Sequence, residues 1–215
     1  MMKRVVCMLM TSPLFLGSLA FGQKWEFGGG AGAGFYTSQT IANAAAGSAN
    51  AKIGTGLSGS AWLTNHSSDR WSGEMRYDYA RGPLQLDGNG SKASFGAQAH
   101  TIHYDMHLHF APREATVRPF VAFGGGVRLF QGTGQEVAAQ PLSRIALLTK
   151  TNDLRPVISV GAGFSARINE RWALRAGVWD YMTPFPKKVI VPNAGSSVSG
   201  WLHGITPMIG LSYLF

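Results

Sequence analysis

The sequence has little of what disulfide-bonded, helical membrane or ordinary soluble proteins depend on. Cysteine occurs once in 215 residues, at Cys7, which excludes a disulfide framework. Charged residues make up 14%, whereas a soluble domain averages about 25%. After the first 22 residues no apolar run of 18 residues occurs, which argues against a bundle of transmembrane helices. A chain of this length forms one ordinary domain.

Glycine and aromatic residues are abundant. The chain has 28 glycines, and aromatic residues make up 11% of it. Many glycines, many aromatics and few charges indicate an all-β chain that does not need a fully polar surface.

Residues 1–22 have the features of a secretory signal peptide. Lys3 and Arg4 precede a mostly apolar run over residues 5–19, and Ala20 and Gly22 supply the small residues required before a cleavage site. We expect cleavage before Gln23, which leaves residues 23–215 as the mature domain, without cysteine. Loss of the two N-terminal cations lowers the net charge from +8 to +6. This mild basic excess suits anionic lipid or sugar. The exported chain has no basic, aromatic-interleaved patch, so we expect no nucleic-acid partner.

Alternation of apolar and polar residues dominates the rest of the chain and predicts strands. Each strand has roughly ten residues or more, and about 9–11 suffice to cross a bilayer as a tilted strand. We expect no helix of useful length. The predicted strands cover residues 24–36, 51–64, 71–80, 93–110, 118–130, 155–168, 172–182 and 201–215.

The connections between these strands alternate in length. Short connections such as "NHSSDR", "APREATV" and "NER" alternate with long ones over residues 37–50, 81–92, 131–154 and 183–200. Short turns at one end and long loops at the other are typical of outer-membrane barrels. The sequence therefore predicts an eight-stranded antiparallel up-and-down transmembrane β-barrel.

The glycine-rich phrases "FGGGAGAGF", "FGGGVRLF" and "VGAGFSARI" have their glycines mostly on the polar face of a strand. An eight-stranded barrel has room inside only for side chains, so inward glycines make space for long neighbours such as Arg128, Arg167 and Arg175. Gly28, Gly30 and Ala33 also fit a loose dinucleotide fingerprint. Because loop-like sequence follows where that motif needs a helix, we reject a nucleotide site.

The apolar faces are expected to point toward lipid and the charged faces into the lumen. A soluble lipocalin-like binding barrel, with the opposite polarity, is the alternative fold class. Unpaired charges in a confined lumen are costly, so we expect Arg128, Arg167 and Arg175 to pair with Glu26, Glu74 and Asp105. The charged residues predicted to face inward are Glu26, Lys52, Glu74, Arg76, Asp78, Asp105, Arg128, Arg167 and Arg175.

Aromatic residues mark both ends of the predicted strands, as at the two interfaces of a membrane. We expect one girdle at the short-turn end and another at the long-loop end. The first comprises Trp25, Trp71, Phe110, Trp172, Tyr213 and Phe215, and the second Phe35, Tyr79, Phe95 and Trp201.

The chain resembles the small eight-stranded outer-membrane barrels, the OmpA-type transmembrane domain and its OmpX-like relatives. The most specific part is "MIGLSYLF", in which Gly210, Tyr213 and Phe215 match the outer-membrane assembly signal, while Met208 departs from its usual polar residue. The phrase "RPFVAFGGGVRLF" is similar to a fifth-strand motif of such barrels. The resemblance implies a Gram-negative outer-membrane location, contact with outer-membrane lipid and insertion by the barrel-assembly machinery. It also implies periplasmic short turns and extracellular long loops. Unlike full OmpA, the chain is expected to have no appended peptidoglycan-binding domain, so cell-wall tethering is not implied.

No set of residues predicts catalysis or a cofactor. His103, Asp105, His107 and His109 alternate along one strand, and imidazole with carboxylate suits zinc or nickel. Neighbours on one face of a strand lie about 6.5–7 Å apart, which is wide for one metal ion, so we favour a hydrogen-bonded interior layer and assign no metal site. Ser94 and His100 share a face but lie too far apart for the direct pair that a lipid A-modifying enzyme needs.

A filled eight-stranded lumen leaves at most a narrow passive channel. The sequence therefore favours a non-enzymatic outer-membrane barrel with a structural or surface-interaction role through its long loops. Loops on a rigid scaffold are where recognition usually lies, although the ligand itself is not predicted.

Overall fold

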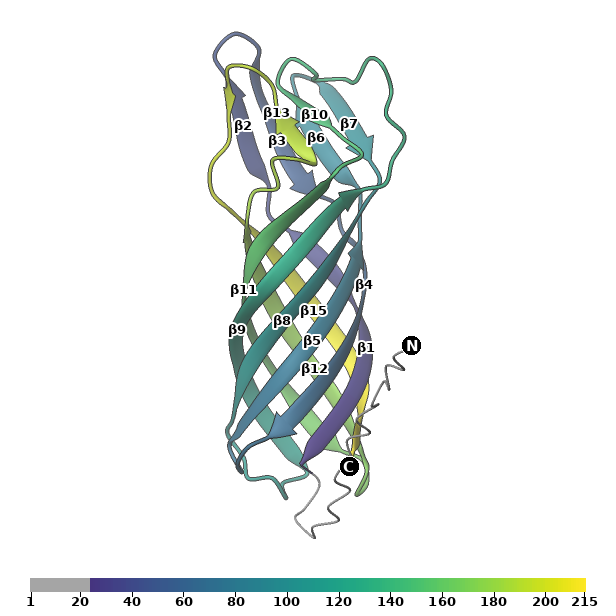
Figure 1. Ribbon diagram of the computed structural model, residues 1–215, viewed down its shortest axis with the longest axis vertical. Helices are drawn as coiled ribbons and strands as arrows, with labels where there is room; N and C mark the ends of the chain where they lie inside the picture. The colour runs from purple at the N-terminus through teal and green to yellow at the C-terminus, as the bar shows by residue number, and fades with distance from the viewer. Residues whose placement is uncertain (1–23) are drawn as a thin grey trace, which may run out of the picture.

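Eight antiparallel strands close into a barrel in the computed structural model, which describes residues 24–215 (Figure 1). The predicted all-β, eight-stranded fold is confirmed. Within residues 24–215 there is no helix of the length and apolarity needed to cross a membrane. The predicted signal peptide, residues 1–22, lies outside the described residues. The barrel strands are β1 (Trp25–Tyr36), β4 (Gly56–His66), β5 (Trp71–Arg81), β8 (Ala97–His109), β9 (Val117–Gly132), β11 (Asn152–Arg167), β12 (Trp172–Pro184) and β15 (Trp201–Leu214).

The barrel closes between its first and last strands. β15 pairs with β1 in a register that sets Phe27 opposite Tyr213 and Gly30 opposite Gly210. On its other side β15 pairs with β12 along the full length of that strand. Every barrel strand therefore has two neighbours, so the closed sheet leaves no strand edge with unpaired backbone groups in the membrane.

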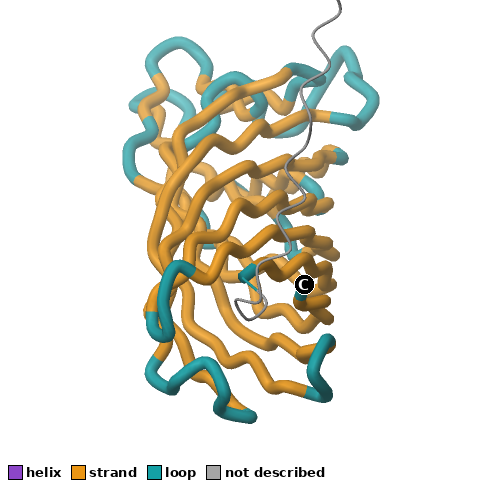
Figure 2. The backbone as a smooth tube through the Cα atoms, turned by 60° about the horizontal axis from the view of Figure 1, so that its bottom comes forward, coloured by secondary structure: helices purple, strands orange, loops and turns teal. Residues whose placement is uncertain are grey.

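The four long connections between barrel strands form further β-sheet structure. It stands above the barrel, at the end opposite the C-terminus (Figure 1). We call residues 37–55, 82–96, 133–151 and 185–200 the cap. Loop segments link its strands, and the opposite end of the barrel carries only turns (Figure 2). One sheet has five strands and the other has two. The cap strands are β2 (Gln39–Asn43), β3 (Gly47–Ile53), β6 (Leu84–Gly88), β7 (Ser91–Phe95), β10 (Ala146–Leu148), β13 (Ile190–Pro192) and β14 (Ser196–Ser197).

The cap has a hydrophobic core of its own, which continues onto the first inward residues of the barrel. Side chains from all four connections meet in it, and several are completely buried. Its turns also have a local cause: Asn89 and Gly90 both have positive φ, as the two-residue turn between β6 and β7 requires. The buried members of the core include Ile41, Ala51, Leu84, Leu86, Ile145, Ala146, Leu148, Val189, Ile190 and Leu202.

Two of the predicted strands, over residues 51–64 and 93–110, are each divided into two separate strands in the structure. Residues 51–53 belong to β3 of the cap, and the barrel strand β4 begins only at Gly56. Likewise residues 93–95 belong to β7, and β8 begins after Gly96. The alternation runs across both breaks, so the sequence pattern does not reveal that the chain exchanges its hydrogen-bonding partners there.

The break before β4 also corrects the position of Lys52. This lysine, predicted to face the lumen, lies exposed on β3 of the cap, opposite Gln85. Gly56 shows why the chain turns at this point, because a Cβ there would overlap the backbone of Arg81. A side chain would prevent this close approach of two strands, so the crossing from cap to barrel needs glycine.

The barrel has its apolar face outside and its polar face inside. Leu57 is 80% exposed, whereas the next residue, Ser58, is buried, and the same alternation follows every barrel strand. A soluble barrel, such as the lipocalin-like alternative, requires the reverse polarity. Other outward apolar residues include Phe27, Met75, Ile102, Phe123, Ile158, Val160, Ile205 and Ile209.

Five of the six residues of the predicted girdle at the short-turn end are exposed on the outer surface, and the sixth, Tyr213, is half-buried. At the cap end the four predicted residues divide. Phe35 and Trp201 are exposed. Phe95 is buried in the core of the cap, and the half-buried Tyr79 donates a hydrogen bond to the side-chain oxygen of Gln98. The prediction for Phe95 was wrong because its segment belongs to the cap sheet.

A charge on the outer face should destabilise the barrel in a bilayer. Ile102 lies near the middle of β8 and is 53% exposed, and we expect Ile102→Arg to cost about 2–4 kcal/mol of unfolding free energy in lipid vesicles. Denaturant titration of vesicle-refolded protein measures this cost. Val137→Arg, at an exposed cap position, is the control and should change little. Equal effects of the two substitutions would contradict the membrane-spanning assignment.

Candidate functional site in the barrel lumen

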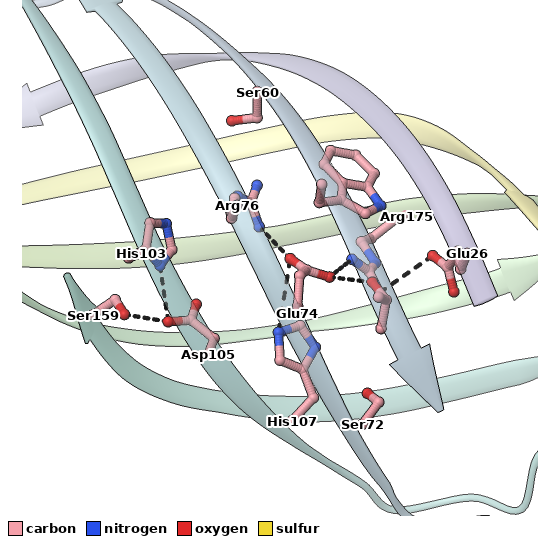
Figure 3. A network of polar contacts seen from close by, with 12 residues as sticks. Glu26, Ser60, Ser72, Glu74, Arg76, His103, Asp105, His107, Ser159 and Arg175 are labelled. Carbon is pink, nitrogen blue, oxygen red and sulfur yellow. Dashed lines mark hydrogen bonds and ion pairs between the residues drawn. The ribbon is translucent and has the colours of Figure 1, made fainter. Parts of the chain in front are cut away.

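An arginine between two glutamates occupies the lumen on the side of the short turns. Nη1 of Arg175 on β12 donates a hydrogen bond to Glu74 of β5, and its other terminal nitrogen lies 3.3 Å from Glu26 of β1 (Figure 3). All three side chains are almost fully buried. Glu74 also accepts a hydrogen bond of 2.7 Å from Thr64, and Glu26 lies 3.0 Å from His66. The charges of this group are paired across four strands.

Asp78 is the centre of a second group, nearer the cap. Its carboxylate accepts hydrogen bonds from Ser60, from Arg76 at 3.2 Å and from the Tyr181 hydroxyl at 2.9 Å. The ring of His103 lies 2.9 Å from the same carboxylate. Four strands therefore supply donors to one buried anion, which fixes their relative positions.

Arg76 joins the two groups. It lies 3.3 Å from Glu74 as well as 3.2 Å from Asp78, and its guanidinium stacks 3.9 Å from the centre of the Trp179 ring. Trp62 contacts it from another side, with its ring centre 5.2 Å away. The cation is thus held by two carboxylates and two aromatic faces, a favourable setting for a desolvated charge.

Glycines opposite the two tryptophans make room for these rings. A Cβ at Gly28 or Gly210 would overlap the Trp62 ring, and a Cβ at Gly161 would lie 2.7 Å from the Trp179 ring. At these three positions glycine accommodates tryptophan, where arginine was expected. Sequence reasoning missed Trp62, although it has the same inward parity as Ser58 and Ser60.

Two inward histidines of β8, His103 and His109, form hydrogen bonds within the lumen, whereas His107 lies 3.8 Å from Glu74. His103 bridges Asp105 and Asp78, with 2.9 Å to each carboxylate, and His109 lies 2.9 Å from the Ser72 hydroxyl. His107 stacks on Phe120, with ring centres 4.9 Å apart. No group of three or more His, Cys, Asp or Glu side chains in residues 24–215 has an arrangement suited to a metal ion.

No protein-family model and no curated protein matches the chain. Among the solved structures similar to it, two match over most of their length. Neisserial surface protein A superposes with a TM-score of 0.56 at 12% identity, covering 89% of this chain and 96% of that one. The outer membrane protein OprG of Pseudomonas aeruginosa gives a TM-score of 0.59 at 14% identity, with 90% and 97% covered.

This chain has the fold of the small outer-membrane β-barrels. The apolar outer face independently places the barrel across a membrane, because only a lipid environment favours such a surface on a closed barrel with a charged interior. Fold and polarity together place the chain in the outer membrane.

Of the residues predicted to form the charge network of this outer-membrane barrel, the structure brings together Glu26, Glu74, Arg76 and Arg175. Two of the three arginines expected to pair with carboxylates do not do so. Arg128 donates a hydrogen bond of 2.7 Å to the Tyr36 hydroxyl instead. Its guanidinium also lies 5.2–5.7 Å from the ring centres of Phe130 and Tyr181. The expected ion pair of Arg128 was wrong because an aromatic cage, formed at the junction with the cap, surrounds it.

Arg167 and Asp105 also have partners other than those expected. Arg167 ends β11 at the turn end of the lumen, where its Nη2 donates a hydrogen bond of 2.9 Å to the carbonyl of Arg113. Asp105 accepts one hydrogen bond from Ser159 and forms another with His103, not with an arginine. The partners are thus one backbone carbonyl, a serine and a histidine, which alternation along single strands does not predict.

The three residues of the predicted assembly signal lie on the closing strand or directly after it. Tyr213 faces outward and stacks edge-on against Trp172 and parallel to Phe215. The nitrogen of Phe215 donates a hydrogen bond of 2.9 Å to the carbonyl of Trp25. Gly210 is required for packing, because a Cβ there would overlap Trp62 and the backbone of Gly29.

Removing the shared cation of the lumen should destabilise the barrel strongly. Arg175→Met leaves Glu26 and Glu74 without their main cationic partner, and we expect a loss of about 3–5 kcal/mol in unfolding free energy. Lys92→Met breaks an exposed ion pair with Asp87 on the cap and should cost less than about 1 kcal/mol. Denaturant titration of the refolded variants compares them. Similar small losses would show that the lumen charges are solvated.

The space opposite Trp62 gives a second test of the packed lumen. Gly28→Leu must displace the Trp62 ring, and we expect a loss of about 1–3 kcal/mol in unfolding free energy. Gly59→Ala is the control, since the nearest atom to a Cβ at that position is 3.9 Å away. Tryptophan fluorescence during unfolding reports both variants. A Gly28→Leu variant as stable as the wild type would contradict tight packing here.

Proposed function

We propose that this outer-membrane barrel serves as a surface-interaction protein, in which the barrel anchors the cap outside the cell. One observation supports this most directly. The four long connections fold around a hydrophobic core and do not extend as separate loops. A folded cap presents a fixed surface, and a rigid surface binds a partner without the entropic cost of ordering loops.

Exposed apolar residues on the cap favour a recognition role over a purely structural one. Val137 is 60% exposed, and Leu147 of β10 is 36% exposed, although both lie well away from the apolar belt of the barrel. The buried core shows that the cap can hide apolar side chains, so these two are available for contacts. We infer that they form part of the surface that meets the partner.

A passive channel is the competing function, and the packing of the lumen argues against it. Trp62, Arg76 and Trp179 are each at most 2% exposed and lie in contact across the barrel. The cap, which holds a buried hydrophobic core, stands above the barrel (Figure 1). A solute would have to displace both layers.

Photo-crosslinking on intact cells tests the interaction role. A photoreactive residue at Val137 or Leu147 should give an adduct that excess purified protein competes away. Glu170 in a short turn is the matched control position and should give no such adduct. In parallel, the refolded protein in a planar bilayer should show no conductance steps. Adducts that are absent or equal at all three positions contradict the recognition role, and steady conductance by the wild type favours the channel.

The proposal extends to assembly and to the lipid environment. We propose that outer-membrane lipid surrounds the apolar belt and that Gly210, Tyr213 and Phe215 form the segment that the barrel-assembly machinery recognises. Outward aromatics on a strand that docks by strand addition would give such recognition its specificity. Tyr213 and Phe215 both lie on the outer surface, which suits that role.

Substitution of Phe215 should separate assembly from stability. We expect Phe215→Ala to change the detergent-refolded stability little and to reduce outer-membrane insertion in cells severalfold. The matched control is Phe27→Ala, an outward aromatic of the first strand with almost the same exposure. Cell fractionation with immunoblotting measures insertion. Normal insertion of Phe215→Ala, or an equal defect in Phe27→Ala, would rule out a specific assembly signal.

A further inference from the structure

Three arginines converge where the lumen opens at the turn end. Arg118 is the first inward residue of β9, opposite Ser165 of β11, and Arg167 occupies the next inward position of β11. Arg113 lies in the turn that precedes β9, and its carbonyl accepts the hydrogen bond from Arg167. Arg167 also donates its backbone N–H to the carbonyl of Thr116, 2.7 Å away, which fixes the turn against β11.

Two of these arginines have buried N–H donors without a hydrogen-bond acceptor. Arg118 is only 7% exposed, and it donates from Nη2 to the carbonyl of Asp69 at 2.8 Å. Within residues 24–215, the buried Nε of Arg118 and the buried Nη2 of Arg113 have no hydrogen-bond partner. Unpaired donors of charged groups are costly in such a place, so they indicate a missing acceptor.

The nearby carboxylates do not supply that acceptor. Glu26 is already paired with Arg175 and His66, and Asp69 and Glu114 act on Arg113 only from beyond ion-pair distance. Partial burial, followed by the positive charge of Arg167, lowers the pKa of the Arg113 guanidinium from its usual value. The positive charges of Arg113 and Arg167 also act on Arg118, as does the negative charge of Glu26, so the three cations repel one another. An anion between them would relieve that repulsion and accept hydrogen bonds from the unpaired donors.

We propose that Arg113, Arg118 and Arg167 form an oxyanion site at the turn end of the lumen, which binds a phosphate group. Guanidinium groups match phosphate oxygens with pairs of N–H donors, whereas a chloride ion offers no such geometry. Arg113 and Arg167 are half-buried, so the site is open to solvent at this end. The phosphate is either a free ion or the headgroup of a phospholipid in the adjacent leaflet. Trp25, Trp71 and Trp172 are exposed at the same end, where that leaflet would meet the protein.

Calorimetric titration of detergent-refolded protein with inorganic phosphate tests the site at constant ionic strength. We expect saturable binding of one phosphate per chain, weakened about tenfold or more by Arg113→Gln and by Arg167→Gln. Arg171→Gln removes an exposed arginine at the same end and should bind as the wild type does. Arg118→Lys keeps the charge and loses the Nε donor, so it should also bind more weakly. Heat-modifiable migration in gel electrophoresis verifies that each variant is folded.

Native mass spectrometry with added lipid distinguishes the two sources of phosphate. Retention of phosphatidic acid but not of diacylglycerol, reduced in Arg113→Gln, identifies a lipid headgroup. Binding of inorganic phosphate without lipid retention identifies a free ion. The proposal is overturned if neither phosphate nor phosphatidic acid binds, or if Arg171→Gln weakens binding as much as the other substitutions do.

Discussion

The ion pairs of Arg175 with Glu26 and Glu74 are the interaction on which the rest of the barrel depends. A barrel with lipid outside has no other place for its charges than the lumen, and a charge there is tolerated only with a partner. These pairs link β12 to β1 and β5, which are not neighbours in the sheet. Arg76 then connects these ion pairs to Asp78. One network of polar contacts in the lumen therefore links the strands of the barrel to one another.

Packing of the lumen follows from that network. Arg76 lies against the rings of Trp62 and Trp179, and each ring needs a glycine opposite it, at Gly28 and at Gly161. Glycines of two of the three glycine-rich phrases are therefore the counterpart of the inward tryptophans. A filled lumen in turn leaves the ends of the barrel as the places where it can meet other molecules. The cap provides an apolar-cored surface at one end, and unpaired arginine donors lie at the other.

Much of the fold could be predicted from the sequence, because polar and apolar residues alternate within each barrel strand and so show which side chains face the lumen and which face lipid. Alternation fixes which side chains face inward, so Glu26, Glu74 and Arg175 were placed in the lumen from local pattern alone. The pattern was insufficient for Lys52 and Phe95, since alternation continues unchanged where the chain leaves one sheet and enters another. The cap was missed for the same reason, as its strands are short and their partners lie in different connections.

The sequence by itself determined the number of barrel strands, the outward apolar face and most of the inward charges, because these depend on residue order within single strands. The tertiary structure alone decided which charges meet. Arg175 reaches Glu26 and Glu74, whereas Arg128 meets the hydroxyl of Tyr36 and Arg167 the carbonyl of Arg113. Partners across a lumen depend on the stagger of strands around the closed barrel, and that stagger is set only when β15 pairs with β1.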